Sequence, residues 1–285
     1  MLSIKSAKCQ AGQGLVEHLI LWPSLVFVVF GAIQLSLLYR TKATFNHVVF
    51  QAARHGATHN GNVNEMHKHM LRGLIPLYLK RDPSVTNYLQ HMVTIYLDNQ
   101  IRPNGQRIGN SPLRMEVISP TQEIFNAFAR NMYQLQEECP RPQRTNGNDR
   151  SLCTEQRFNQ IPNDNLNIRS SAIRTINLPN RELVRVNLQD ANLLKVRGHW
   201  CAPLTMPLVA STFYHTLFRF RQLWNQNFWW FYASKPEVRN HPHWQACVRR
   251  TALNLAEVAA GTSVRIYYIP ISADAVVRMQ TPFRQ

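Results

Sequence analysis

A single glutamate stands at the edge of a long uncharged run near the amino end of the chain. Glu17 is followed, from His18 to Tyr39, by no Asp, Glu, Lys or Arg. About twenty apolar residues in a helix, rising ~1.5 Å each, cross a hydrocarbon layer of ~30 Å. A carboxylate at the mouth of such a span is costly to bury and usually has a partner or a task. Glu17 is therefore the first candidate for a functional side chain.

The residues before this run are expected to form a removable leader. Residues 1–12 carry Lys5 and Lys8 and no acidic residue, so they are suited to the cytoplasmic side of a membrane. A secretory signal is cut after its apolar segment, whereas Gly12 lies before the segment here. A cut at Gly12 would leave the apolar helix in the mature chain as an anchor.

The block Gly12-Gln13-Gly14-Leu15-Val16-Glu17 resembles the type IV prepilin processing site. In that family, an aspartic prepilin peptidase cuts after a Gly and the fifth mature residue is Glu. The resemblance implies cleavage between Gly12 and Gln13, and it assigns Glu17 to pairing with a neighbouring subunit's amino terminus during assembly. The alternative is an uncleaved signal anchor whose Glu17 is solvated at the membrane surface.

The rest of the chain predicts an α+β protein. A long transmembrane helix with an amphipathic continuation is expected over residues 13–57, ending near Gly56 or Asn60-Gly61, and a single periplasmic domain over 58–285. The whole chain has 45% hydrophobic and 17% charged residues, a composition with which such a domain can bury a core. Helices are expected at 63–79, 84–100 and from 119, strands at 113–118, 183–188, 193–200, 264–268 and 275–280, and a loop at 139–171.

The cysteines favour an oxidising compartment. A cut after Gly12 removes Cys9 and leaves four cysteines, an even number that permits three pairings. The favoured pairs are Cys139 with Cys153 and Cys201 with Cys247. Disulfides are favoured because the cysteine spacings fit no common metal motif, and the alternative is four reduced thiols.

The chain is strongly basic. Its formal charge of +16 falls to +14 without the two leader lysines. Such a charge attracts polyanions, so a membrane-anchored protein that binds DNA or lipopolysaccharide is the alternative function. The basic residues are scattered and no nucleic-acid motif accompanies them, which makes a nucleic-acid partner unlikely. Arg40 and Lys42 follow the span and oppose the positive-inside tendency, but long domains translocate regardless of charge, and the basic leader favours a cytoplasmic amino terminus.

Other candidate sites are weaker. The aromatic stretch 213–232 suits either core packing, which is favoured, or an interfacial helix. The histidine pairs His55 and His59, His67 and His69, and His241 and His243 have no Cys or carboxylate set beside them at ligand spacing, so no metal is expected. No nucleophile elbow, phosphate loop or HExxH motif occurs, so neither catalysis nor a cofactor is predicted.

Several short blocks narrow the resemblance to the TadE-like proteins of tight-adherence (Flp) pilus systems. The resemblance implies a minor pilin or pseudopilin in the bacterial inner membrane, single-pass, with a periplasmic domain. Its implied partners are prepilin peptidase, other pilin-like subunits and the pilus assembly machinery, and it has no cofactor. The blocks are Gly12–Gly56, Ile118–Thr121, Ile161–Leu166, Asp190–Val196, Pro203-Leu204 with Pro207–Val209, and Arg278–Pro282.

Overall fold

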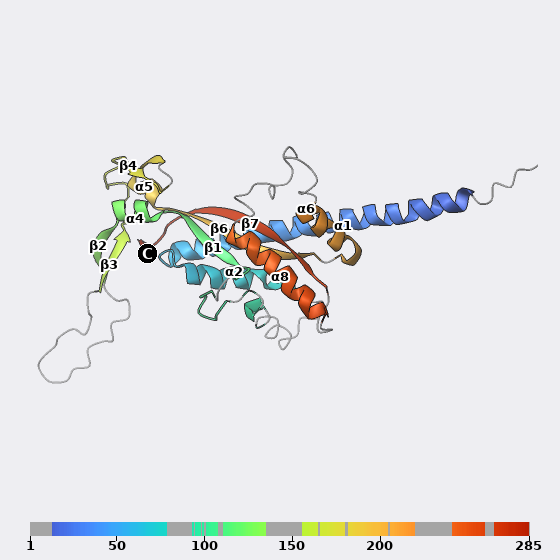
Figure 1. Ribbon diagram of the computed structural model, residues 1–285. Coiled ribbons are helices and arrows are strands. Elements are labelled where there is room, and N and C mark those ends of the chain that lie inside the picture. The colour runs from blue at the N-terminus through green and yellow to red at the C-terminus, as the bar shows by residue number, and fades with distance from the viewer. Residues whose placement is uncertain are drawn as a thin grey trace, which may run out of the picture. The chain divides into compact units, whose positions relative to one another are not determined.

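The structure is a computed structural model, shown in Figure 1. It describes residues 13–78, 93, 95–97, 99, 101–107, 111–134, 156–164, 166–179, 182–204, 206–219, 241–259 and 265–284. Its larger elements are the helices α1 (Gln13–Thr58), α2 (Val63–Tyr78), α4 (Gln122–Phe128), α6 (Pro207–Arg219) and α8 (Pro242–Ala259), and the strands β1 (Arg114–Ser119), β6 (Leu193–Leu204) and β7 (Tyr267–Arg278). The smaller ones are α5 (Leu188–Ala191), β2 (Arg130–Gln134), β3 (Gln156–Ile161), β4 (Arg174–Asn177), β5 (Leu183–Val186) and β8 (Phe283–Arg284).

Helix α1 is a single helix of 46 residues, drawn in blue in Figure 1. At ~1.5 Å per residue it is about 69 Å long, roughly twice the thickness of a hydrocarbon layer. Among the described residues it is the one helix long and apolar enough to cross a membrane. It ends at Thr58, one residue beyond the predicted end, where Asn60 and Gly61 take positive φ angles of 55° and 76°. Left-handed residues directly after a helix commonly terminate it.

Small residues allow α2 to pack closely against the second half of α1. A Cβ atom added at Gly73 would lie 2.8 Å from the Val48 side chain, and one at Gly56 would lie 2.5 Å from Met66 Sδ. Both distances are too short for real atoms. Glycine at these two positions is therefore what lets the backbones of α1 and α2 approach each other.

Strand β6 lies against the same half of α1. A Cβ atom at Gly198 would be 2.4 Å from Val49 Cγ2, so the strand backbone itself contacts the helix. Trp200 is 2% exposed, and its ring centroid lies 5.9 Å from that of Phe45. Strand β6 is the centre of the sheet β1-β6-β7, and it pairs with β1 in antiparallel register, Arg114 opposite His199.

The other described strands form two smaller sheets. Strand β3 pairs in antiparallel register with both β2 and β8, and β4 pairs in the same manner with β5. Helices and antiparallel sheets thus follow a long apolar helix. The α+β class predicted from the sequence is confirmed.

Several elements differ from the sequence predictions. Residues 156–161 form strand β3 inside the expected loop 139–171, and α8 was not predicted. Strand β7 is one continuous strand where two were expected at 264–268 and 275–280. Pro270 lies inside it, and a strand at the edge of a sheet tolerates proline because one row of its N–H groups has no ladder partner. Most of the helix expected at 84–100 lies outside the described residues.

The chain divides into two compact units that interleave in sequence. The first unit comprises Met1–Ala43 and Cys201–Ile271, and the second comprises Thr44–Trp200 and Ser272–Gln285. The first unit therefore contains the apolar half of α1 together with α6 and α8. The second contains the α1–α2 hairpin, β1 and most of the smaller elements.

Candidate functional site

The predicted processing and assembly residues lie at the start of α1. Gly12 lies outside the described residues, whereas Gln13 is the first residue of the helix. Glu17 lies four residues later, about one helical turn along. Its side chain is exposed, and within the described part of the chain it forms no ion pair. A carboxylate in this position is open to a partner from another molecule.

The apolar part of α1 that follows Glu17 is exposed along its length. Leu19, Trp22 and Val28 are 67%, 63% and 68% exposed. Large exposed apolar surface marks contact with a membrane or another protein. No Asp, Glu, Lys or Arg interrupts it before Arg40. The segment thus has the length, the composition and the exposure of a membrane anchor.

Gln34 is a site residue that the sequence analysis missed. It lies within the apolar run yet is only 1% exposed. Its Oε1 accepts a hydrogen bond of 3.0 Å from the backbone N–H of Met206, directly before α6. The first N–H groups of a helix have no partner inside the helix, so this bond satisfies one polar group at the start of α6. The signal in the sequence was a lone amide in an otherwise apolar run.

A disulfide joins Cys201 at the end of β6 to Cys247 on α8, with the Cα atoms 5.4 Å apart. This is one of the two pairs predicted from the sequence. The other pair, Cys139 and Cys153, lies outside the described residues. Helix α8 also supports the start of β7, since Thr251 Oγ1 accepts from Tyr268 N–H at 3.1 Å and Asn254 Oδ1 accepts from Ile266 N–H at 2.7 Å.

Tyr214, which belongs to the aromatic stretch, packs inside the first unit. Tyr214 on α6 is 9% exposed, and its ring centroid lies 5.0 Å from that of Tyr267 on β7. The Tyr267 hydroxyl donates to Ser211 Oγ at 3.1 Å. Core packing, the favoured interpretation, is therefore confirmed for Tyr214. Residues 220–232 lie outside the described residues.

Three of the blocks that carried the TadE-like resemblance meet in the second unit. Asn192 is fully buried, and its Nδ2 donates to Pro162 O and Leu188 O at 2.9 Å each. Its backbone carbonyl accepts from Met279 N–H at 2.9 Å, and Asn163 Nδ2 donates to Met279 O at 2.8 Å. The blocks around residues 161, 190 and 278 thus form one hydrogen-bonded junction.

The carboxyl-terminal segment then caps the end of α1. The backbone N–H groups of Gln280 and Thr281 donate to Ala57 O at 3.0 and 3.1 Å, and Arg284 N–H donates to Asn60 O at 3.0 Å. Carbonyl groups in the last turn of a helix need such external donors. These bonds therefore satisfy backbone carbonyl groups at the carboxyl end of α1 and directly after it.

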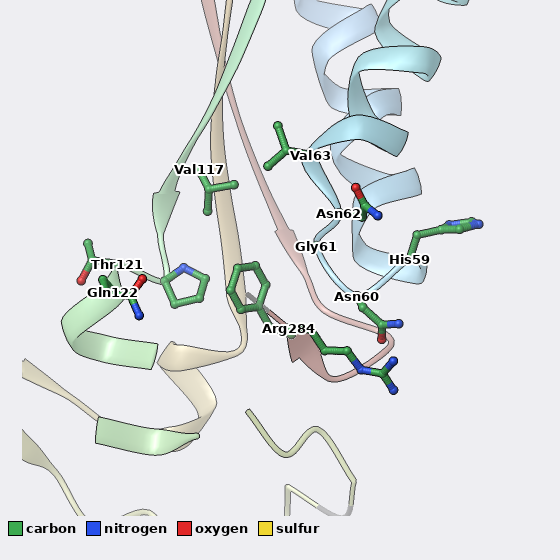
Figure 2. A pocket seen from close by; sticks show the side chains of 11 residues that line it. His59, Asn60, Gly61, Asn62, Val63, Val117, Thr121, Gln122 and Arg284 are labelled. Atoms are coloured by element: carbon green, nitrogen blue, oxygen red, sulfur yellow. The ribbon is translucent and has the colours of Figure 1, made fainter. Parts of the chain in front are cut away.

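A pocket of about 610 Å³ lies beside this cap, shown in Figure 2. Val63 and Val117 point toward each other across it, whereas His59 points away. The lining residues are His59, Asn60, Gly61, Asn62, Val63, Val117, Pro120, Thr121, Gln122, Phe283 and Arg284. They combine apolar and polar groups with the cationic Arg284, and none of them is an acidic residue or a thiol.

The histidines at 55, 59 and 69 form a cluster where α1 and α2 meet. The ring of His55 stacks on that of His69, with centroids 3.4 Å apart, and lies 3.8 Å from that of His59. Partial burial and the neighbouring imidazoles lower the pKa of His55 to about 4. The lone pairs of an imidazole lie in the ring plane, so stacked rings do not aim their nitrogens at a common ion. The cluster therefore does not have the geometry of a metal centre.

His67, on the buried side of α2, is held as a neutral ring. Its Nε2 accepts from Met115 N–H at 3.0 Å, and its Nδ1 lies 3.2 Å from Gly105 O. Nδ1 must then carry the proton, because the carbonyl can only accept. Protonation of Nε2 would break the first bond. Burial, the main cause, and the positive charge of Arg107 lower the pKa of His67 to about 4.

The free energy of unfolding of the domain that follows α1 is consequently expected to fall on acidification, because His67 becomes protonated. The folded-state pKa of His67 lies below the unfolded value of 6.5, so the unfolded chain binds a proton first. The stability that the neutral ring contributes is complete above pH ~6.5 and is lost as the pH falls to ~4, by about 3 kcal/mol. Denaturant unfolding of His67→Gln, which keeps a donor and an acceptor, should show a weaker loss between these values. Parallel pH profiles for the two proteins would contradict this role.

Comparison with known families bears on the amino-terminal segment. The family model described as TadE-like protein matches residues 12–54. The amino-terminal segment therefore resembles this family. The matched residues include Gly12, Gln13 and Glu17 and most of α1, and the TadE-like segment thus coincides with the exposed anchor and its candidate assembly residues. No curated protein and no solved structure matches the chain.

Proposed function

We propose that this protein is a pilin-like, membrane-anchored component of a tight-adherence pilus assembly system, and that it acts through subunit interactions. The observation that carries the proposal is the TadE-like match over residues 12–54, which starts at the predicted cut site and covers Glu17. The match supports a pilin-like protein associated with Tad pili in general. The specific role proposed here rests on the residues inside the matched segment.

Processing is the first step of the proposed role. Prepilin peptidase cuts between Gly12 and Gln13 and releases the basic leader, and α1 then begins at the new amino terminus. The proposal is supported by the position of Gly12 before the apolar run and by the TadE-like match, which starts at residue 12. The mature chain retains α1 as its anchor.

Assembly is the second step. Glu17 pairs with the free amino group of a neighbouring subunit, since a carboxylate at the membrane edge is stabilised by an opposite charge. The exposed apolar face of α1 supplies the surface on which anchors pack side by side. In the proposed topology α1 crosses the inner membrane with its amino terminus in the cytoplasm, and the α+β domain lies in the periplasm. The Cys201–Cys247 disulfide can persist in that oxidising compartment. The protein works as a structural subunit, without a cofactor and without catalysis.

The experiment that tests this function is a count of surface pili after gene deletion. We expect a deletion strain to lose surface pili and adherence, and a plasmid copy of the wild-type chain to restore both. The alternative, a basic protein that binds polyanions, gives normal pili and a loss of DNA or lipopolysaccharide retention that is steeply dependent on salt. Normal piliation and adherence in the deletion strain would contradict the proposed function.

A further inference from the structure

Helix α8 brings a histidine beside the disulfide of the first unit. His243 and Cys247 are four residues apart and so lie on one face of the helix, and they are 5% and 0% exposed. Cys201, 2% exposed, reaches the same place from β6. His243 Nε2 lies 3.9 Å from Cys247 Sγ, and the donor atoms of the three residues all lie within 4.8 Å of one another.

Two thiolates and one imidazole form a donor set that suits Zn(II). In tetrahedral sites, Zn–S bonds are about 2.3 Å and Zn–N bonds are about 2.0–2.1 Å, which places ligand atoms roughly 3.5–3.8 Å from each other. The separation of Nε2 and Sγ in the oxidised chain is already close to this value. Reduction breaks the S–S bond, and the two sulfur atoms can then move apart to the separation that a metal requires.

We propose that the reduced chain binds one Zn(II) ion through Cys201, Cys247 and His243, and that the zinc site and the disulfide are alternative states of the same residues. Binding exchanges two thiol protons for the ion, so that the two thiolates and the imidazole coordinate it. Formation of the disulfide removes the ligands, because the two thiolates together lose two electrons and join in an S–S bond that no longer coordinates the ion. A protein disulfide of the oxidising compartment accepts two electrons, becomes two thiolates, and Zn(II) is released.

The two states have a consequence for the folding of this chain. The mature chain has four cysteines, and three pairings compete for them. An ion held by Cys201 and Cys247 keeps their sulfurs adjacent and lowers the reactivity of both thiolates toward Cys139 and Cys153. The zinc site thus favours the pairing that the structure contains. This inference takes from the proposed function only the cleavage that removes Cys9 and the oxidising compartment, and it does not depend on the role of Glu17 in pilus assembly.

The test uses the full chain in detergent with Cys9, Cys139 and Cys153 replaced by serine, so that one cysteine pair remains. After reduction with a phosphine and its anaerobic removal, the protein is titrated with Co(II), a spectroscopic probe for tetrahedral zinc sites. We expect one Co(II) per chain, with thiolate-to-metal charge-transfer bands, and displacement of Co(II) by one equivalent of Zn(II). The oxidised protein should bind less than a tenth as much.

Two variants assign the ligands. His243→Ala should weaken Co(II) binding by at least tenfold, whereas His47→Ala, the same change at an exposed histidine on α1, should leave it unchanged. Reoxidation of His243→Ala should still leave no thiol open to alkylation, which shows that the two cysteines remain close. The proposal is overturned if reduced wild-type protein binds no stoichiometric Co(II), or if binding is equal in the oxidised protein or in His243→Ala.

Discussion

Replacement of Cys201 and Cys247 together by alanine is expected to lower the free energy of unfolding by about 4 kcal/mol. The disulfide links positions that are 46 residues apart, and closing a loop of this length removes that much conformational entropy from the unfolded chain in the chain-entropy model. Alanine is the suitable replacement because both sulfurs are buried, and a serine hydroxyl there would need a new hydrogen-bond partner. Denaturant unfolding of the non-reduced protein in detergent measures the difference.

The matched control is Cys139→Ala with Cys153→Ala. If these two cysteines are bridged, their shorter loop contributes less, about 3 kcal/mol in the same model. Alkylation of the denatured, non-reduced mature protein, which lacks Cys9, should then find no free thiol. A loss below about 1 kcal/mol for the Cys201 and Cys247 pair would show that this bridge does not hold the first unit together.

The elements that could be predicted from the sequence are those whose pattern is local. The uncharged run predicts the body of α1 and the Asn60-Gly61 turn predicts its carboxyl end, because both signals are properties of short segments. The alternation of Arg114, Met115, Glu116 and Val117 gives β1 in the same way. The processing block Gly12 to Glu17 is also a local pattern, because it is recognised by the spacing of its residues along the chain.

The elements that could not be predicted depend on distant partners. Strand β3 lies in a polar segment, and pairing with β2 and β8 makes it a strand. Helix α8 turns Thr251 and Asn254 inward to bind the start of β7, so its buried stripe is partly polar and the apolar period is hidden. The sequence does not show that His243 lies beside two sulfur atoms. Cys247 is one helical turn away on α8, and Cys201 comes from the distant strand β6.

Replacement of Glu17 by glutamine is expected to reduce surface piliation by at least roughly tenfold while cleavage and membrane insertion stay intact. An unpaired charge inside the bilayer costs at least ~2.5 kcal/mol, so a pair between Glu17 and a neighbour's amino group contributes on that scale to each assembly step. Each 1.4 kcal/mol is a factor of ten in an equilibrium constant. Glutamine removes the charge and nearly preserves the size, so charge alone is tested. Electron-microscopic pilus counts and adherence assays measure the effect.

Glu65→Gln serves as the control for this change. Glu65 lies on α2 and pairs with Lys68 at 2.5 Å on the surface, a contact worth at most about 1 kcal/mol, so its loss should leave pili normal. Normal piliation in Glu17→Gln would leave the amino-terminal segment as a targeting device. Retention of DNA, measured in the same strains over a range of salt concentrations, would then test the polyanion-binding alternative.

The mass of the protein extracted from membranes of a strain with active prepilin peptidase tests the central claim most directly. The account predicts a chain that begins at Gln13, without Met1 to Gly12, and a Gly12→Glu variant that keeps its full length because the peptidase no longer accepts the site. Amino-terminal sequencing should give the same start. A full-length wild-type chain in these membranes would contradict the account, because the TadE-like segment would then be an uncleaved anchor and Glu17 would lack the free amino terminus it is proposed to bind.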